Sequence, residues 1–240
     1  MKRNNRQVSF LGLLIFLIIA SACDSGNIYP KPDKPTSSIK AVATFSFVGR
    51  DAFPMQYTIV LGTYSKASPY PLSSLKLNKP EDGKEATFNL DNVPIEAETI
   101  ELTLNQRYGN KRIHTFYSYP IPGKMSMSTI VLPPAAINLA SFARVSDQLF
   151  MPQCIQCHGG SEKAAANLYL TNGKSYSNLV NVDAVKSSKK RVVPKNQHGS
   201  FLLDVLTRRD AVKFTHTDLS TLGEDDVNLV REWIQNGAQE

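Results

Sequence analysis

The chain has 240 residues, and its 27 Lys and Arg against 21 Asp and Glu give a formal net charge of +6. Three of the basic residues and none of the acidic ones lie in the first 22 positions, which leaves 24 basic against 21 acidic side chains in the remainder. A balance this even argues against a nucleic-acid partner.

Residues 1–22 have the pattern of an export signal. Lys2, Arg3 and Arg6 form a basic start, and an almost uninterrupted apolar run extends from Val8 to Ala20. The run is shorter than the roughly 20 apolar residues that a transmembrane helix needs. We therefore expect export from the cytoplasm and removal of this segment.

The next residue, Cys23, is a predicted lipidation site. The run Ala20-Ser21-Ala22-Cys23 resembles the lipobox of bacterial lipoproteins, although Ala20 stands where Leu is more usual. The resemblance implies cleavage before Cys23, diacylglycerol on its thiol and acylation of the new N-terminus. The alternative is an ordinary signal peptide with an incidental cysteine. Lipidation predicts a membrane-anchored protein of the cell envelope, with the outer membrane favoured and its periplasmic or surface face undecided.

Residues 23–38 are predicted to form the lipidated cysteine and a flexible tether. Asp24 to Ser38 is rich in Pro, Ser, Asp and Lys and has only two sizeable apolar residues. Such a composition favours an extended segment that holds the folded part away from the bilayer.

Residues 39–134 have the period-two pattern of β-strands. Ala43, Phe45 and Phe47 alternate with other residues, and turn residues separate the later runs. After this first strand, further strands are predicted at Tyr57–Leu61, Leu72–Leu77, Ala86–Leu90, Thr99–Asn105, Arg112–Tyr119 and Ser126–Leu132. About seven short strands fit an immunoglobulin-like β-sandwich. No cluster of acids, histidines or nucleophiles is present, so we expect spacing or docking of another protein rather than chemistry.

Pro133-Pro134 marks a predicted boundary, and residues 135–240 have a helical pattern. Ser141 is placed to cap a first helix that runs into Cys154. Later elements are predicted as a short helix or turn over Ser175–Val182, a helix capped by Ser200 with Leu202, Leu203, Val205 and Leu206 on its buried face, and a last helix from Gly223 to Gly237.

The first of these helices leads into Cys154-Ile155-Gln156-Cys157-His158, the C-x-x-C-H attachment signature of c-type haem. In this motif the two thiols form thioethers with the haem, and the adjacent imidazole is the proximal iron ligand. One covalent haem c is therefore predicted on Cys154 and Cys157, with His158 on the iron. With Cys23 lipidated, no thiol remains for a disulfide.

Two other uses of the motif compete with haem attachment. A structural zinc site would need two further ligands, and no second C-x-x-C exists, so only Cys154, Cys157 and two histidines could form one. A redox-active C-x-x-C would sit at a helix start after a strand, and nothing upstream has that pattern. Haem is the favoured interpretation.

Residues 142–238 resemble the single-haem, class I cytochrome c domains of planctomycete-type and related bacterial proteins. The matching segments are Cys154–Gly160, Leu168–Leu170, Arg191–Pro194, Ser200–Leu203 and Glu232–Ala238. The resemblance implies an all-α cytochrome c fold with haem between its first and last helices. The chain is thus predicted to be multidomain, an N-terminal all-β immunoglobulin-like sandwich followed by a C-terminal all-α cytochrome c domain.

The distal iron ligand departs from that family. A Met-Pro segment commonly supplies it just before the last helix, but none of the five methionines here follows the haem motif. The equivalent place holds Lys213 to Asp218, so His216 is the favoured ligand and His198 the alternative. Lys213 or an open site are the remaining possibilities.

A basic loop, defined by Lys186, Lys189, Lys190 and Arg191, precedes the Ser200 helix. Most such runs are simply solvated. The alternatives are a docking patch for an acidic redox partner and, for Arg191, contact with a haem propionate.

These features predict a membrane-tethered, single-haem electron carrier with redox protein partners in the envelope. It would be an electron-transfer protein rather than an enzyme. Two alternatives stay open: a haem enzyme with an open distal face that activates peroxide, and a cell-surface binding module with an accessory haem.

Overall fold

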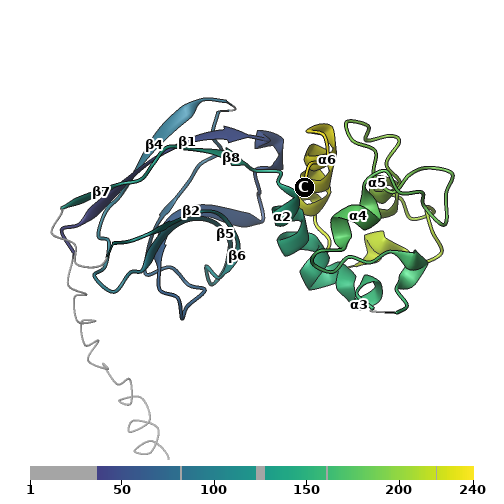
Figure 1. Cartoon of the computed structure of the whole chain (residues 1–240), viewed down its shortest axis with the longest axis horizontal. Coiled ribbons are helices and arrows are strands. Elements are labelled where there is room, and N and C mark those ends of the chain that lie inside the picture. Colours follow the sequence, from purple (N-terminus) through teal and green to yellow (C-terminus); the bar gives the residue numbers. More distant parts are fainter. Residues whose placement is uncertain (1–36, 82, 123–127, 161, 220) are drawn as a thin grey trace, which may run out of the picture. The chain divides into compact units, whose positions relative to one another are not determined.

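The computed structural model of the chain describes residues 37–240 except 82, 123–127, 161 and 220. The predicted signal segment, Cys23 and most of the tether lie outside these residues. Within them, an N-terminal region of two β-sheets is followed by a helical region (Figure 1). The strands are β1 (Lys40–Val48), β2 (Tyr57–Tyr64), β3 (Ser73–Lys76), β4 (Glu85–Leu90), β5 (Thr99–Gln106), β6 (Arg112–Pro120), β7 (Thr129–Val131) and β8 (Ala135–Asn138).

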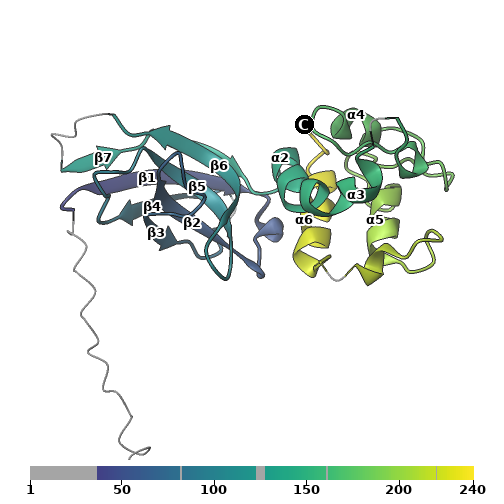
Figure 2. The same ribbon diagram turned by 90° about the horizontal axis from the view of Figure 1, so that it is seen from below.

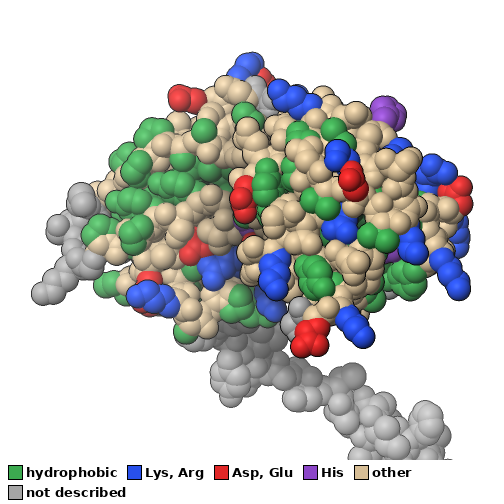
Figure 3. All heavy atoms as spheres, turned by 45° about the vertical axis from the view of Figure 1, so that its right-hand side comes forward, with side chains coloured by type: hydrophobic (Ala, Val, Ile, Leu, Met, Phe, Trp, Pro, Cys, Tyr) green, Lys and Arg blue, Asp and Glu red, His purple; other side chains and the backbone are tan. Residues whose placement is uncertain are grey.

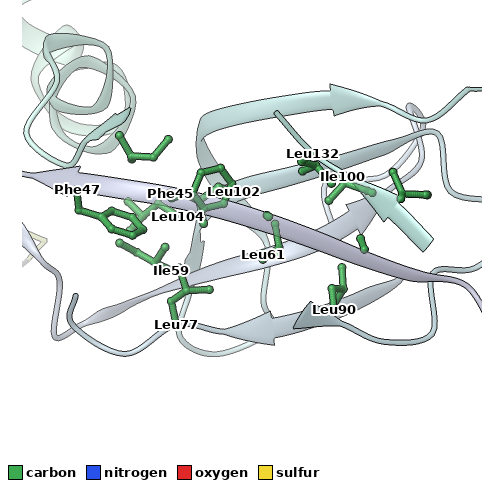
Figure 4. Close-up of a cluster of buried hydrophobic side chains, with 14 of the residues drawn as sticks. Phe45, Phe47, Ile59, Leu61, Leu77, Leu90, Ile100, Leu102, Leu104 and Leu132 are labelled. Atoms are coloured by element: carbon green, nitrogen blue, oxygen red, sulfur yellow. The ribbon is translucent and has the colours of Figure 1, made fainter. Parts of the chain in front are cut away.

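The seven predicted strands are confirmed in position as β1 to β7. One sheet has the order β4-β1-β7, with β8 also paired to β1, and the other has the order β3-β2-β5-β6. Alternate residues of each strand face a single shared core, as the period-two pattern requires. Figure 4 shows this core, which includes Phe45, Phe47 and Leu90 from one sheet and Ile59, Leu61, Ile100, Leu102 and Leu104 from the other.

The helical pattern does not begin at residue 135 as predicted. Residues 135–138 form β8, which pairs in parallel with the second half of β1, from Phe45 to Val48. Ile137 is buried in the shared core, and this contact with a distant strand decides the conformation of a four-residue segment. The sheet therefore extends to Asn138.

The helical region begins with a continuous helix, Phe142–His158, built from α2 (Phe142–Val145), a π-helical segment η2 (Ser146–Cys154) and α3 (Ile155–His158). The Ser141 hydroxyl caps it by accepting the amide hydrogen of Arg144 at 3.2 Å, as predicted. The remaining elements are η3 (Ala165–Asn167), α4 (Ser175–Leu179), α5 (Phe201–Thr207), η4 (His216–Asp218) and α6 (Glu224–Gln235).

The last helix, α6, lies beside both α2 and α5 (Figure 2). Its inner face buries Leu229, Val230, Trp233 and Ile234 in a second core. The Phe142 and Trp233 rings meet across α2 and α6 with centroids 5.2 Å apart. The first and last helices of this region are thus packed against each other, and Gly237 ends α6 with a φ of 100°.

The predicted cap of α5 is wrong in detail. Ser200 is the residue before the helix, but its hydroxyl makes no cap hydrogen bond. The hydroxyl instead donates to the Asn196 carbonyl at 2.7 Å and accepts the Val193 amide hydrogen at 2.9 Å. The Ser200 hydroxyl is therefore bonded to the loop that precedes α5 and does not cap the helix.

The sheets and the helices are joined by a buried polar network, whose central residue is Arg144 of α2. Its side chain has no exposed area and donates to the carbonyl oxygens of Ala52 and Leu139 at 2.8 and 2.6 Å. Asp225 of α6 accepts the amide hydrogens of Met55 and Gln56 at 2.8 and 2.6 Å. The loop between β1 and β2 is therefore held by both the first and the last helix.

Burial shifts the acid–base properties of this network. Burial lowers the pKa of Arg144 to about 10, and nearby Asp225 and Asp226 oppose that shift. Burial, with the same two carboxylates, raises the pKa of Tyr57 to about 12. Arg144 stays charged and Tyr57 neutral at pH 7, so Arg144 is a buried positive counter-charge to Asp225 and Asp226.

No helix among the described residues is both long and apolar enough to cross a bilayer.

Candidate functional site

The haem motif lies at the end of the Phe142–His158 helix, where the π-helical segment gives way to α3. Pro152 lies inside that segment. A regular α-helix would lose a hydrogen bond at Pro152 and would press its ring against the carbonyl group four residues earlier. The wider π turn relieves this conflict, and its last bond runs from the Ile155 amide back five residues to the Phe150 carbonyl.

Cys154 and Cys157 are one turn apart on this helix and both are free thiols. Cys154 is half-buried and lines the cavity described below, whereas Cys157 is exposed. Burial raises the pKa of the Cys154 thiol to about 12. A redox-active C-x-x-C pair needs a thiol with a lowered pKa, so the environment of Cys154 is the opposite of what that alternative requires.

His158 is the last residue of α3 and is held by the loop that follows it. Its Nδ1–H donates to the Ala165 carbonyl at 3.0 Å, which leaves Nε2 as the unprotonated nitrogen. Burial lowers the pKa of His158, so the ring is neutral at pH 7. A neutral imidazole fixed by a backbone carbonyl is the form in which histidine binds a metal.

The loop after His158 is unusually tight. A Cβ on Gly159 would clash with the Ile155 carbonyl oxygen, so only glycine fits directly after the histidine. The chain returns at Leu170, whose amide donates to the His158 carbonyl at 2.8 Å. Between them Ala166 and Asn167 have φ values of 54° and 51°. Left-handed conformations cost about 1–2 kcal/mol for residues other than glycine, so surrounding contacts must hold this turn.

Arg191 supplies those contacts. Its guanidinium group donates to the carbonyl oxygens of Ala166 and Asn167, both at 3.1 Å, and to that of Asn178 at 2.8 Å. The side chain is buried, and burial lowers its pKa. Among the described residues no carboxylate pairs with it, so it is a buried cation whose counter-charge is not supplied by that part of the chain.

His216 opens η4 in the loop between α5 and α6. Its Nδ1–H donates to the Phe214 carbonyl at 3.0 Å, which leaves Nε2 as the ring nitrogen not engaged by that carbonyl. The Phe214 ring packs edge-on against the imidazole, with centroids 5.1 Å apart. The loop is tied down by an ion pair between Arg209 and Asp218 at 2.7 Å.

The rings of His158 and His216 face one cavity, with centroids 6.3 Å apart and planes inclined by 20°. A metal–imidazole bond is about 2 Å long, and a ring nitrogen lies about 1 Å from its centroid, so two imidazoles across one metal ion have centroids about 6 Å apart. The two nearly parallel rings are therefore separated by about the distance expected of two imidazoles that would bind one metal ion from opposite sides.

The cavity is partly open, and about 750 Å³ of space that includes open solvent lies between its walls. Its lining is almost wholly apolar and comes from Leu149, Phe150, Leu168, Leu170, Leu179, Phe201, Leu202, Val205, Leu206 and Val212. Arg191 and Lys186 are its cations. An apolar cavity lined by two imidazoles and two cationic side chains has the groups that a flat apolar macrocycle with a bound metal and anionic substituents would need.

The other predicted site residues lie elsewhere. His198 is in an exposed turn and does not line the cavity, so the geometry favours His216. In the basic loop, Lys189 pairs with Asp204 at 2.7 Å and Lys190 with Asp183 at 2.8 Å. Lys and Arg side chains are spread over the helical region, with acidic ones beside several of them (Figure 3). Most of the predicted docking patch thus has partners within the domain.

The zinc alternative has no structural support. Among the described residues, no three or more His, Cys, Asp or Glu side chains are grouped so that they could hold a metal ion. A tetrahedral zinc site needs four such ligands, whereas a haem takes only its axial ligands from the protein.

Sequence reasoning missed two features near the site. The carbonyl groups of Ala165 and Phe214 orient His158 and His216. Every residue has a backbone carbonyl, so its use as an acceptor cannot be predicted from residue types. His114 of β6 is buried and bonds through Nδ1 to Asp147 of η2 at 2.7 Å. This bond joins the sheet to the helix that contains the C-x-x-C-H motif. The inward position of His114 on β6 was the feature of the sequence that could have indicated it.

A comparison of the chain with protein-family models, with curated proteins and with solved structures gives no match in any of the three. The functional assignment therefore depends on the motif and on the residues of the cavity.

Proposed function

We propose that this chain is a membrane-tethered, single-haem c-type cytochrome that carries electrons in the cell envelope. The main support is one observation. The imidazoles of His158 and His216 line one apolar cavity with their ring centroids 6.3 Å apart, and the Nδ1 atom of each is hydrogen-bonded to a backbone carbonyl. Cys154 and Cys157 would hold the haem covalently, with His158 as proximal and His216 as distal ligand. Bound there, the haem would supply a one-electron ferric/ferrous couple.

The chain's own residues would set the properties of that couple. With haem bound, the apolar lining would limit access of water to it, which favours the less charged state of a buried redox centre. Arg191 lines the cavity, and three of its five N–H groups are engaged, so two remain as donors that would serve an anionic haem substituent. Imidazole in place of a thioether removes the ligand that raises the potential.

We further propose a cytochrome c fold for the helical region and an immunoglobulin-like sandwich for the sheets. The contact between Phe142 and Trp233 supports the first, because it joins the first and last helices beside the cavity. The core shared by two sheets supports the second. No contact of the described residues favours the haem-enzyme alternative, since His216 would occupy the position that an oxidant needs.

Covalent haem is the first testable consequence. The full chain, produced with the haem-attachment machinery of a bacterial envelope, should give a haem-stained band on a denaturing gel. Replacing Cys154 or Cys157 by serine should weaken the band, and replacing both should abolish it. Gln156→Ala, an exposed change inside the motif, is the matched control and should keep the stain. A colourless wild-type chain would contradict the proposed function.

Lipidation of Cys23, which lies outside the described residues, is a separate prediction. Expressed with its signal, the protein should partition into detergent, because several acyl chains anchor firmly whereas one binds only marginally. Cys23→Ser should release the protein or leave its signal uncleaved. Release of intact wild type by salt alone would show that the anchor is not lipid.

A further inference from the structure

Arg191 contacts the turn whose Ala165 carbonyl orients His158. Two of its three hydrogen bonds go to the carbonyl groups of Ala166 and Asn167, the two left-handed residues of the η3 turn. The third goes to the Asn178 carbonyl in α4, which anchors the guanidinium group from the other side. The planar guanidinium group of an arginine can bond three carbonyl groups at once. The ammonium group of a lysine, at the end of a flexible side chain, cannot hold them in that geometry.

The same turn contains the Ala165 carbonyl, which accepts the hydrogen bond from His158. Ala165 directly precedes the two left-handed residues, and its oxygen accepts the His158 Nδ1–H at 3.0 Å. The amide of Leu168 also donates to the Ala165 carbonyl, at 3.1 Å, so this oxygen is fixed by the shape of the turn. Paired left-handed residues other than glycine persist only where their surroundings impose them.

We propose that Arg191 is a positioning residue for the proximal ligand. It clamps the Ala165–Asn167 turn and thereby aims the Ala165 carbonyl at Nδ1 of His158. The inference deepens the proposed function and depends on it, because it concerns the ligand strength of His158 toward a haem iron. It gives Arg191 a role beyond the charge that a propionate would meet.

The clamp and the charge have opposite effects on the reduction potential. A strong Nδ1–H···O=C bond makes the imidazole a better electron donor and favours the ferric state. Weakening that bond raises the potential. Removing a nearby positive charge also favours the ferric state, and so lowers the potential. A substitution that keeps the positive charge but removes the planar guanidinium group therefore separates the effect of the clamp from the effect of the charge.

Arg191→Lys in the full, haem-loaded chain is that substitution. The clamp predicts a higher reduction potential than in wild type. It also predicts that the His158 Nδ1 proton exchanges with water about 2- to 10-fold faster, as expected when one hydrogen bond is lost. Arg208→Lys is the matched control, because the Arg208 side chain is exposed and bonds only to Asp210 among the described residues. It should change neither quantity.

Ala166→Pro tests the turn while the Arg191 side chain itself is unchanged. Proline fixes φ near −65° and cannot adopt the observed φ of 54°. The Ala166 substitution should shift both measurements in the same direction as Arg191→Lys, and if Arg191→Lys fails to fold, an unchanged potential in the Ala166 variant still overturns the clamp. An unchanged or lowered potential in either folded variant overturns the clamp and leaves the cytochrome assignment intact. A wild-type chain that carries no haem overturns both.

Discussion

Replacing His216 by alanine is expected to convert a low-spin ferric haem into a high-spin one. The imidazole of His216 lies in the same cavity as that of His158, at a centroid distance of 6.3 Å. Its Nδ1 is occupied by the Phe214 carbonyl, so Nε2 is the nitrogen left to bind. Removing the ring leaves the distal position open, and cyanide should then bind readily.

The measurement is the ferric absorption spectrum of wild type and variant. Wild type should be low-spin and should lack the weak near-infrared band of sulfur–iron ligation, because no methionine follows the motif. His198→Ala is the control and should leave the spectrum unchanged. A low-spin spectrum that survives in His216→Ala and disappears in His198→Ala would transfer the role to His198.

Replacing Arg144 by methionine is expected to destabilise the whole folded unit by about 3–5 kcal/mol, the usual cost of removing one partner from a buried charge network. Methionine keeps much of the volume. It leaves the carbonyl groups of Ala52 and Leu139 without their donor. It also leaves Asp225 and Asp226 without their buried counter-charge. Because these groups join the sheets to the helices, sheets and helices should lose stability together.

Chemical denaturation of the full chain, followed by circular dichroism and haem absorbance, measures this effect. Arg208→Met removes an exposed arginine from the same region and should leave the midpoint unchanged. An Arg144→Met protein as stable as wild type would show that the network does not hold the two regions together.

The strands could be predicted because their signal is local. Ala43, Phe45 and Phe47 alternate with less buried neighbours, and the structure buries those three. The missed strand, β8, has only four residues, and its conformation depends on parallel pairing with β1, about ninety positions earlier in the chain. Long-range pairing of that kind leaves no periodic signal.

The two predicted serine caps show the same limit. Ser141 caps its helix as its position suggests, since nothing competes for its hydroxyl. Ser200 occupies an equivalent position, but Val193 and Asn196 bond to its hydroxyl. The cations of the basic loop were also visible in the sequence, whereas their partners Asp183 and Asp204 are known only from the fold.

For the site, the motif identified the residues that would bind haem, and the structure adds what surrounds them. Spacing alone singled out Cys154, Cys157 and His158. The choice between His198 and His216 rested on position before the last helix, and the cavity now favours His216. Nothing in the sequence indicated that Arg191 bonds the turn beside His158, because its partners are backbone oxygens.

The visible absorption spectrum of the purified full chain, oxidised and then reduced, tests the central claim most directly. A covalent, bis-histidine haem c predicts a red protein with sharp bands in the reduced state, a low-spin ferric spectrum and no sulfur–iron band. Those bands should stay with the polypeptide after denaturation, because thioethers hold the haem. A colourless protein, or haem that is extracted from the denatured chain, would contradict the account.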